Sequence, residues 1–407
     1  MRSLKRALFL LPTISTGLVR LLQLAILLIL SNVGTGADRN LLVAGFGLLS
    51  SFAMMTDSGA GNFLLSTPLG EISRSIYRKA VSFHFGLAAL GSVLAIIFIA
   101  VPAGGYIPPA VLILLACFAV TQTLDSTGRI IRAPLMVAKR DAAYAAPDVV
   151  LLVLKLPILA VAFIQADLAI LFLLPIPSLI VAVVTFISTD RALTASGVDE
   201  HRIYRRILEF GATGALSAFY SQSPLLIAST LLTLDQLATL TIVYRIIQAL
   251  DLVPGTLSLQ LIPRIRGRAT GPWTYWTAFF LGGLVIAGVV VAALPIIELM
   301  FGHQFSDIWV FVLVALSFAP KSGNYALVAY LMGSGQIRTR LVLTIAAAVV
   351  SLGLSITFAL VAGATGLAAV TLTVELLFAL GGFFALRRLA LKPAPTRISE
   401  AQPESVL

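Results

Sequence analysis

Apolar runs long enough to cross a lipid bilayer recur along the whole sequence, and they constrain its fold more than any other feature. Runs of about 20 apolar residues with few charges predict transmembrane helices. Hydrophobic residues make up 59% of the 407 positions and charged residues only 11%, whereas soluble proteins contain about 25% charged residues. The sequence therefore predicts an all-α polytopic membrane protein.

Charged residues and turn residues divide these runs into predicted spans. The approximate ranges of the twelve spans are 8–32, 41–66, 80–102, 108–128, 145–164, 167–188, 208–231, 236–260, 273–299, 308–332, 341–361 and 365–386. The first run follows a basic start, as a signal peptide would, but it is too long, contains Arg20 and lacks a clear cleavage site. We therefore expect it to be retained as the first span.

Lysine and arginine residues are concentrated in alternate loops between the predicted spans. Cytoplasmic loops of membrane proteins carry such an excess, so we expect both termini to lie in the cytoplasm. The same pattern explains the net charge of +10 without a basic face, and we expect no nucleic-acid partner. The tail, 389–407, is polar, contains proline and serine, and is predicted to be disordered.

Cysteine and histidine are sparse in this chain. Cys117 is the single cysteine and lies in an apolar run, and the three histidines, His84, His201 and His303, are far apart in the sequence. These numbers exclude a disulfide framework and a Cys/His metal cluster. We expect no metal and no cofactor, and we interpret Cys117 as a packing residue.

Two distant segments share one plan, which indicates an internal repeat. In "MMTDSGAGNFLL" and "QALDLVPGTLSLQLIPR", Asp57 matches Asp251, and a glycine follows four residues later, at Gly61 and Gly255. With six spans in each half, the copies enter the membrane from the same side, which predicts parallel repeats about a pseudo-twofold axis along the membrane normal. We expect two six-helix lobes, 1–195 and 196–388, with a substrate site between them.

Charged residues lie near the middle of several predicted spans. The cations are Arg20, Lys155, Arg245 and Lys321, and the acids are Asp57, Asp251 and Glu375. Each would cost about 2.5–3.5 kcal/mol at the bilayer centre, so such residues face a bundle interior or an aqueous cavity. They either form interhelical ion pairs, such as Arg20 with Asp57, or line a cavity whose cations bind an anionic head group.

The three acids and the two repeat glycines have roles of their own in this hypothesis. Asp57, Asp251 and Glu375 are candidates for ion coupling, because a buried carboxylate can accept a proton. Gly59 and Gly61, like Pro254 and Gly255, weaken regular helix and permit a bend or a close helix contact. They are therefore either packing residues or hinges for lobe closure.

Several stretches resemble the polysaccharide (oligosaccharide-lipid) flippase family, the O-antigen flippase type, of the multidrug/oligosaccharidyl-lipid/polysaccharide (MOP) exporter superfamily. They are "MMTDSGAGNFLL", "IVYRIIQALDLVPGTLSLQLIPRI", "FGHQFSDIWVFVLVALSFAPKSGNYALVAYLMGSGQIRTRL" and "GATGLAAVTLTVELL". The resemblance implies two six-helix lobes in the inner membrane and movement of a polyprenyl-pyrophosphate-linked oligosaccharide from the cytoplasmic to the outer leaflet by alternating access.

The resemblance also implies a cationic cavity, for which the four central cations are the candidates. Cavity charges vary within the family, so this assignment rests on the depth of these residues in their spans. The implied partners are the lipid-linked oligosaccharide, membrane lipids, H⁺ or Na⁺ as coupling ion, and polysaccharide assembly proteins.

Two alternatives compete with a flippase. A multidrug cation/ion antiporter of the same fold would be expected to carry an acid in the first span, but no Asp or Glu lies between Met1 and Gly34. A membrane-embedded glycosyltransferase or polymerase would need substantial extracytoplasmic loops with catalytic residues, and these loops are only a few residues long. We therefore expect a transporter and no enzyme.

Overall fold

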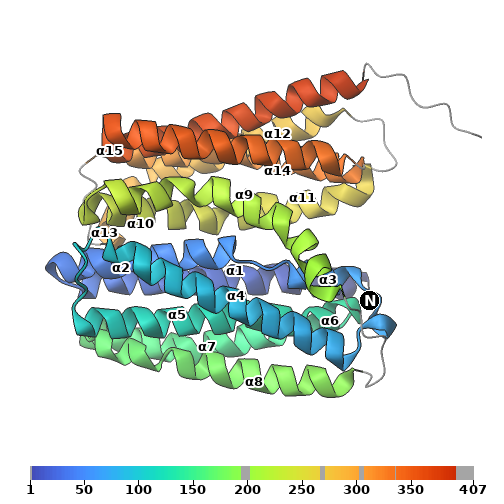
Figure 1. Ribbon diagram of the computed structural model, residues 1–407, viewed down its shortest axis with the longest axis horizontal. Helices are drawn as coiled ribbons and strands as arrows, with labels where there is room; N and C mark the ends of the chain where they lie inside the picture. Colours follow the sequence, from blue (N-terminus) through green and yellow to red (C-terminus); the bar gives the residue numbers. More distant parts are fainter. Residues whose placement is uncertain (1, 194–201, 266–270, 302–306, 335, 391–407) are drawn as a thin grey trace, which may run out of the picture.

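The computed structural model describes residues 2–193, 202–265, 271–301, 307–334 and 336–390. Helices cover almost all of these residues, and no β-strand occurs among them. In chain order the elements are α1 (Arg2–Val33), α2 (Gly36–Met55), α3 (Ala60–Ser66), η1 (Leu69–Glu71), α4 (Arg74–Ala100), α5 (Pro109–Ile131), α6 (Ala133–Val137), α7 (Asp141–Gln165), η2 (Leu168–Leu173), α8 (Pro175–Ala192), α9 (Ile203–Leu231), α10 (Leu234–Leu250), α11 (Leu252–Ile265), α12 (Pro272–Ala292), α13 (Leu294–Phe301), α14 (Ile308–Gly333) and α15 (Ile337–Ala390) (Figure 1).

Every predicted span corresponds to helix in the structure, which confirms the all-α polytopic fold class. Nine helical segments of the described chain are long and apolar enough to cross a membrane, and a shorter apolar helix covers Gly17–Val33. The last two predicted spans lie in α15, whose two halves meet at Gly363, where φ is 56°. The span predicted at 208–231 lies in α9.

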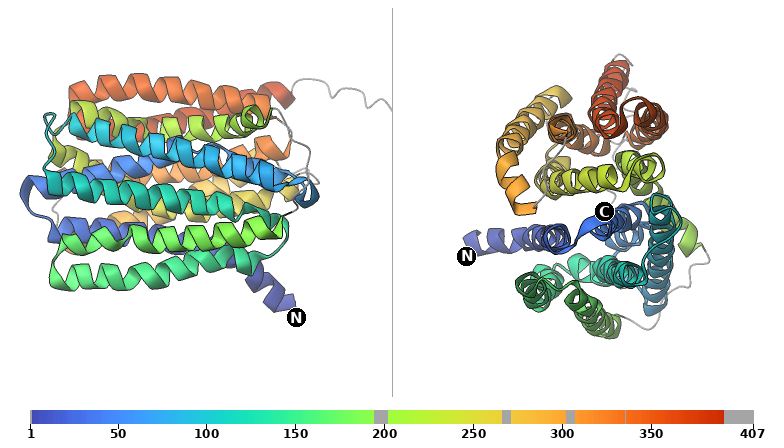
Figure 2. Two further views of the ribbon diagram at one scale, coloured as in Figure 1. Left: turned by 60° about the horizontal axis from the view of Figure 1, so that its bottom comes forward. Right: turned by 90° about the vertical axis from the view of Figure 1, so that its left-hand side faces the viewer.

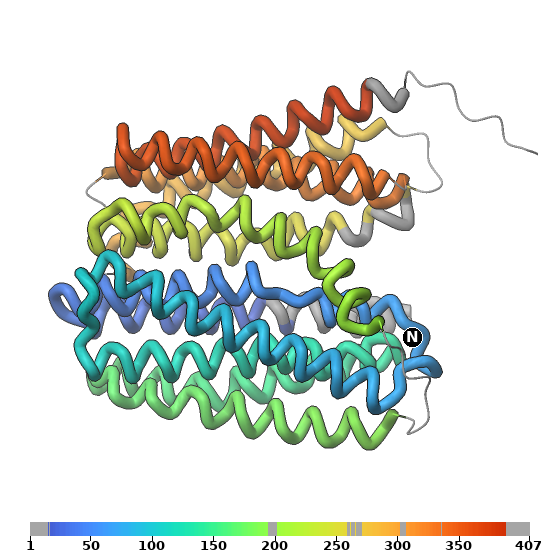
Figure 3. Tube along the Cα trace, in the orientation of Figure 1, coloured from blue at the N-terminus to red at the C-terminus, as the bar shows by residue number. Residues whose placement is uncertain are grey.

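Several spans predicted as single helices are each broken in two, and two of these breaks concern the internal repeat. The range 41–66 contains α2 and α3, separated by four residues from Thr56 to Gly59, and the straightened chain between them is visible in Figure 3. The range 236–260 contains α10 and α11, which meet at Asp251. Pro254 follows this second break and lacks the N–H that would bond to the carbonyl of Leu250. Both breaks therefore fall at the aspartates of the internal repeat.

The helices form two groups that lie against each other. Helices α1–α8 make up one group, and α9–α15 make up the other, as the side view and the end view show (Figures 1 and 2). The predicted boundary between 195 and 196 lies outside the described residues, as does nearly all of the predicted tail, 389–407.

One large buried apolar cluster joins the two groups. It contains Leu27 and Leu42 from the first group and Leu237 and Phe311 from the second. Helices α2 and α10 approach closely there, because a Cβ added to Gly47 would lie 2.2 Å from Thr241 Cγ2. Near the start of the same two helices, the Asn40 amide donates a hydrogen bond of 3.2 Å to Asp235.

Outward faces of the peripheral helices are apolar. On α12, Leu281, Val285 and Val289 follow one another at four-residue spacing, and Val285 is 67% exposed. Side chains four apart lie on one face of a helix. Such exposed apolar faces are what a multi-pass membrane protein presents to lipid.

Candidate functional site

A cavity of about 580 Å³ lies between the two groups of helices. Its polar lining comes from both of them. The first group contributes Arg20, Gln23, Ser50, Asp57, His84, Gln122, Asp125, Ser126, Arg129, Arg132, Asp148, Ser178 and Thr185, and the second contributes Ser217, Tyr220, Ser221, Gln222, Arg245, Gln248, Asp251, Lys321, Asn324, Tyr325 and Arg340. A cavity with this many polar groups inside an apolar bundle is the candidate site.

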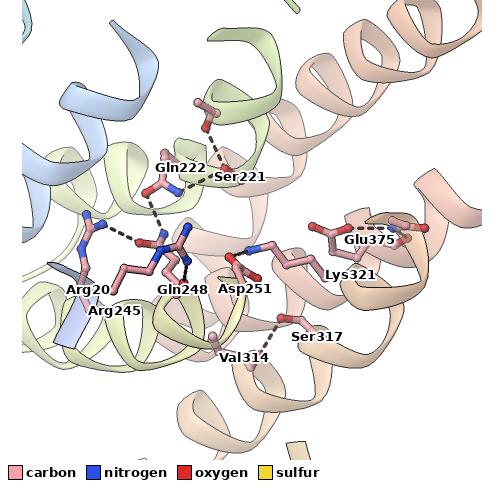
Figure 4. A network of polar contacts seen from close by, with 12 residues as sticks. Arg20, Ser221, Gln222, Arg245, Gln248, Asp251, Val314, Ser317, Lys321 and Glu375 are labelled. Atoms are coloured by element: carbon pink, nitrogen blue, oxygen red, sulfur yellow. Dashed lines mark hydrogen bonds and ion pairs between the residues drawn. The ribbon is translucent and has the colours of Figure 1, made fainter. Parts of the chain in front are cut away.

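Two guanidinium groups meet on one part of the cavity wall (Figure 4). Arg20 from α1 donates to the backbone oxygen of Gln248, and Arg245 from α10 donates to the Gln248 side chain at 2.5 Å. Arg245 also donates to the backbone oxygen of Gly47 and, at 2.8 Å, to Ser51 Oγ. These acceptors are neutral, and neither arginine forms an ion pair with a carboxylate among the described residues. This part of the wall therefore carries uncompensated positive charge.

Lys321 lines the cavity and forms an ion pair with Asp251. Its ammonium lies 2.6 Å from Asp251 Oδ2, and the two side chains are 16% and 8% exposed. Asp251 lies at the break between α10 and α11, and its carboxylate faces Lys321 of α14. Lys321 also lines a small adjacent cavity of about 20 Å³.

Glu375 is buried behind Lys321 and lines this small adjacent cavity. Its Oε2 accepts a hydrogen bond of 2.8 Å from the side chain of Asn324, which itself lines the main cavity. The structure therefore groups Asp251, Lys321, Asn324 and Glu375 in one polar cluster of the second half. Figure 4 shows Asp251, Lys321 and Glu375 of this cluster.

Lys155 lies apart from the other three predicted cations. Its side chain is 1% exposed and its ammonium is 2.6 Å from Asp125 Oδ2. The other oxygen of Asp125 accepts a hydrogen bond of 2.8 Å from Ser178. Asp125 and Ser178 line the cavity, whereas Lys155 is not among its lining residues. Lys155 thus neutralises the Asp125 carboxylate from outside the cavity lining.

Asp57 lies at the α2–α3 break, with its side chain 53% exposed, and it lines the cavity. The suggested Arg20–Asp57 ion pair does not form in this structure: Arg20 bonds to Gln248, and the Asp57 Oδ1 accepts a hydrogen bond of 3.1 Å from Gly59 N. Gly59 has a left-handed φ of 76°, a conformation that glycine adopts without strain.

The two repeat glycines lie inside helices. A Cβ added to Gly61 in α3 would lie 3.1 Å from Ile130 Cδ1, and one added to Gly255 in α11 would lie 3.7 Å from Tyr325 Cε1. The first contact is tight and the second is ordinary. In the first copy of the repeat, the backbone break is therefore at Gly59 and not at Gly61.

Other cavity residues were not among the predicted site residues. The most prominent are Arg132 and Asp148, whose side chains are 5% and 2% exposed and form an ion pair of 2.6 Å. In the sequence, Arg132 follows the fourth predicted span, 108–128, and belongs to a basic run, which predicts a place in the adjoining loop. The helix break at Arg132, just before Pro134, instead turns this side chain inward.

Several buried polar atoms on the cavity wall have hydrogen-bonding capacity left. They include Arg245 Nε, Asp251 Oδ1, Gln122 Nε2, Arg132 Nε and Asp148 Oδ2. A buried polar atom without a partner costs about 1–3 kcal/mol. A polar ligand or ordered water in the cavity would offset this cost.

Metal-binding geometry is not found in the described residues. No group of three or more His, Cys, Asp or Glu side chains there could hold a metal ion. Cys117 is a free thiol of intermediate exposure in α5, and of the histidines only His84 lies in the described part of the chain.

Comparison with known proteins identifies the fold. No family model matches the sequence, and no curated protein matches it. Among solved structures, an inward-facing MATE multidrug-resistance transporter of the MOP superfamily is 15% identical, with a TM-score of 0.63, over 92% of this chain and 96% of that one. The lipid II flippase MurJ, in an inward closed conformation, is 14% identical, with a TM-score of 0.64, over 93% and 87%.

A third similar structure is a MOP superfamily transporter from Pyrococcus furiosus, described as having a binding pocket of reverse polarity that suggests a different function. It is 16% identical to this chain, with a TM-score of 0.53 and coverage of 95% of both chains. At such identities the likeness concerns the fold. The chain is therefore an all-α multi-pass membrane protein with the fold of the MOP superfamily transporters.

Proposed function

We propose that this chain is a flippase that moves a polyprenyl-pyrophosphate-linked oligosaccharide, a polysaccharide precursor, from the inner to the outer leaflet of the cell membrane by alternating access. In this proposal the regions 1–195 and 196–388 are the two lobes, the central cavity binds the head group, and H⁺, Na⁺ or the membrane potential drives the cycle. Polysaccharide assembly proteins would receive the product.

The observation that carries the proposal is the pair of arginines on the cavity wall. Among the residues that the structure describes, Arg20 and Arg245 donate to neutral oxygens only, so a bound pyrophosphate would supply the missing negative charge. Arginine binds phosphate through two parallel N–H groups, and charge-assisted bonds of this kind are about twice as strong as neutral ones. Arg245 Nε is buried and has no partner, which leaves a donor for the ligand.

Cavity size and composition agree with a large polar head group. The volume of about 580 Å³ lies within the range of roughly 300–1,000 Å³ that small-molecule sites occupy. Amides, hydroxyls and carboxylates from the first group of helices line the wall beside the arginines, including Gln122, Asp125 and Ser178. Such groups can hydrogen-bond to sugar hydroxyls.

The MOP fold adds support of a different kind. One structural neighbour is named a lipid II flippase, so this helical frame is used to move a lipid-linked substrate. The second candidate function is a multidrug cation/ion antiporter, since other neighbours are multidrug MATE transporters. The exposed carboxylate of Asp57 on the cavity wall is the observation that favours it.

The test is a liposome assay with purified protein and a fluorescent polyprenyl-pyrophosphate-linked sugar. We expect wild type to move the lipid and Arg20→Ala and Arg245→Ala to slow movement at least tenfold. Arg245→Lys should restore only part of the rate, because lysine lacks the planar fork of arginine. Arg205→Ala is the matched control, since Arg205 is 72% exposed and pairs with Glu209 outside the cavity.

Opposite results would reject the flippase. If every arginine variant keeps the wild-type rate while remaining folded, the cationic wall is not the head-group site. If wild type moves no lipid-linked sugar but exports a cationic dye, and Asp57→Asn abolishes that export, the antiporter is the correct function.

A further inference from the structure

The cavity wall also carries an imidazole. His84 lies in α4, its side chain is 3% exposed, and it borders the cavity. Its Nδ1 lies 3.0 Å from Ser58 Oγ and its Nε2 lies 3.4 Å from Ser126 Oγ. Histidine is the side chain whose ordinary titration falls between about pH 5 and 8. A buried imidazole held by two hydroxyls, each able to donate or accept, can exist in either charge state without losing its partners.

A carboxylate connects this imidazole to the cavity. Asp57 Oδ1 lies 3.9 Å from His84 Nδ1, and the Asp57 side chain is 53% exposed on the cavity wall. The charged groups that interact with His84 are Asp57, from the α2–α3 segment, and Arg129, from α5. Two other helices that pack on α4 direct titratable groups at different residues of α4. Asp190 of α8 pairs with Arg78, and Tyr204 of α9 contacts Phe83.

The same α2–α3 segment makes a close contact with the other half of the molecule. The turn is held by hydrogen bonds of 3.1 Å from Gly59 N to Asp57 Oδ1 and from Ala60 N to Ser58 Oγ. A Cβ added to Gly211 in α9 would lie 2.3 Å from the Ser58 backbone oxygen. Phe63 of α3 and Phe210 of α9 extend the contact, with ring centroids 6.1 Å apart.

Two side chains of the α2–α3 turn thus connect His84 to the contact between this turn and α9. Asp57 and Ser58 both hold the turn and both contact or face His84. The backbone of that turn packs on α9, which belongs to the other group of helices. A change of charge on the imidazole therefore acts directly on the segment that packs on α9.

We propose that His84 and Asp57 form a proton-binding site that controls the contact between the α2–α3 turn and α9. The proposal rests on the proposed function, in which it identifies H⁺ as the coupling ion. A proton from cavity water binds the imidazole, and the imidazolium draws the Asp57 carboxylate into an ion pair. The carboxylate then holds the Gly59 turn against Gly211. Loss of the proton releases Asp57 toward the cavity water and loosens the turn.

The test measures the distance between α4 and α9 by double electron–electron resonance. Spin labels are attached to Ser75→Cys and Leu208→Cys in a Cys117→Ser background, and the protein is placed in liposomes of plain phospholipid. As the pH is raised from about 3.5 to 8.5, we expect the short-distance population to fall at least threefold in the labelled parent. His84→Gln, which keeps hydrogen-bonding groups but cannot be charged, should abolish that change.

Two further variants keep the test decisive. Asp57→Asn retains an oxygen that can accept from Gly59 N but lacks the charge, so it should also reduce the pH response, and its exposed position favours normal folding. Asp38→Asn, an exposed carboxylate at the opposite end of α2, is the matched control and should leave the response unchanged.

Three results would overturn the proposal: no pH response in the parent, a full response in His84→Gln with normal elution and thermal stability, or a full response in Asp57→Asn. The assay contains no lipid-linked sugar, so its outcome is independent of the substrate. A pH response that depends on His84, combined with failure of the sugar-lipid assay, would reject the flippase and keep the proton site.

Discussion

Charged side chains inside the bundle serve different purposes according to the groups beside them. Lys155 and Arg132 are paired with Asp125 and Asp148, and both cations are 5% exposed or less. Lys321 is also paired, but it borders the cavity. Arg20 and Arg245 bond to neutral oxygens. The charges of a buried ion pair neutralise each other, whereas an arginine without a carboxylate partner can bind an anion. We therefore expect the ligand site at Arg20 and Arg245.

At this scale we predict that Lys155 is structural. Lys155→Met leaves Asp125 as an unpaired charge facing Ser178, and removing one member of a buried ion pair costs about 3–5 kcal/mol. We expect a clear fall in the thermal unfolding temperature in detergent. The double variant Lys155→Met/Asp125→Asn should recover most of the loss. Equal stability of Lys155→Met and wild type would show that the pair contributes nothing.

At the scale of elements, helix breaks and close helix contacts shape the site. The breaks at Thr56–Gly59 and at Asp251 place the repeat aspartates where helix is interrupted. Glycines then allow backbones of the two groups to approach, at Gly47 beside Thr241 and at Gly59 beside Gly211. Small residues permit such contacts between membrane helices.

We predict that the contact between α2 and α10 requires Gly47. Gly47→Ala places a methyl group against the buried Thr241 side chain, so the two helices must separate by a small distance. Because Arg245 donates to the Gly47 oxygen, this separation should also weaken the arginine site. We expect transport to fall several-fold and Thr241→Ala to rescue it in the double variant. Failure of the rescue, with a folded protein, would place the effect elsewhere.

On the scale of the whole molecule, the cavity lies between two groups of helices that are joined at one end by apolar packing and by the Asn40–Asp235 hydrogen bond. In an alternating-access cycle this end must open. We predict that a disulfide between Asn40→Cys and Asp235→Cys, in a Cys117→Ser background, stops transport and that a reductant restores it. The single-cysteine variants are the controls. Full transport by the cross-linked protein would exclude opening at this end.

The orientation of the chain is also a property of the whole molecule. The lysine and arginine distribution predicts both termini in the cytoplasm. Reporter fusions check this: a fluorescent protein at the C-terminus should fold and fluoresce, and a periplasmic reporter inserted at Gly104, between α4 and α5, should be active. The reverse pattern would invert the proposed direction of the substrate path.

The apolar runs and the sparse charges were enough to predict helices in a membrane, because a bilayer tolerates little else. The paired Asp–Gly segments also predicted a bend, and a helix break lies at each repeat aspartate. The separation of Lys155 from the cavity and the inward turn of Arg132 could not be read from the sequence. Depth in a span is a local property, whereas the direction of a side chain around its helix depends on the neighbours against which the helix packs.

Sequence alone thus determined the class of fold and the presence of charged residues within the spans, since hydropathy acts on each segment independently of the others. Tertiary structure decided which charges are paired and which remain available. The Arg20–Asp57 pairing was suggested by proximity along the chain, but Arg20 instead contacts Gln248, more than two hundred positions away. Long-range packing brings such partners together, and it alone placed His84 beside Asp57 and the turn that contacts α9.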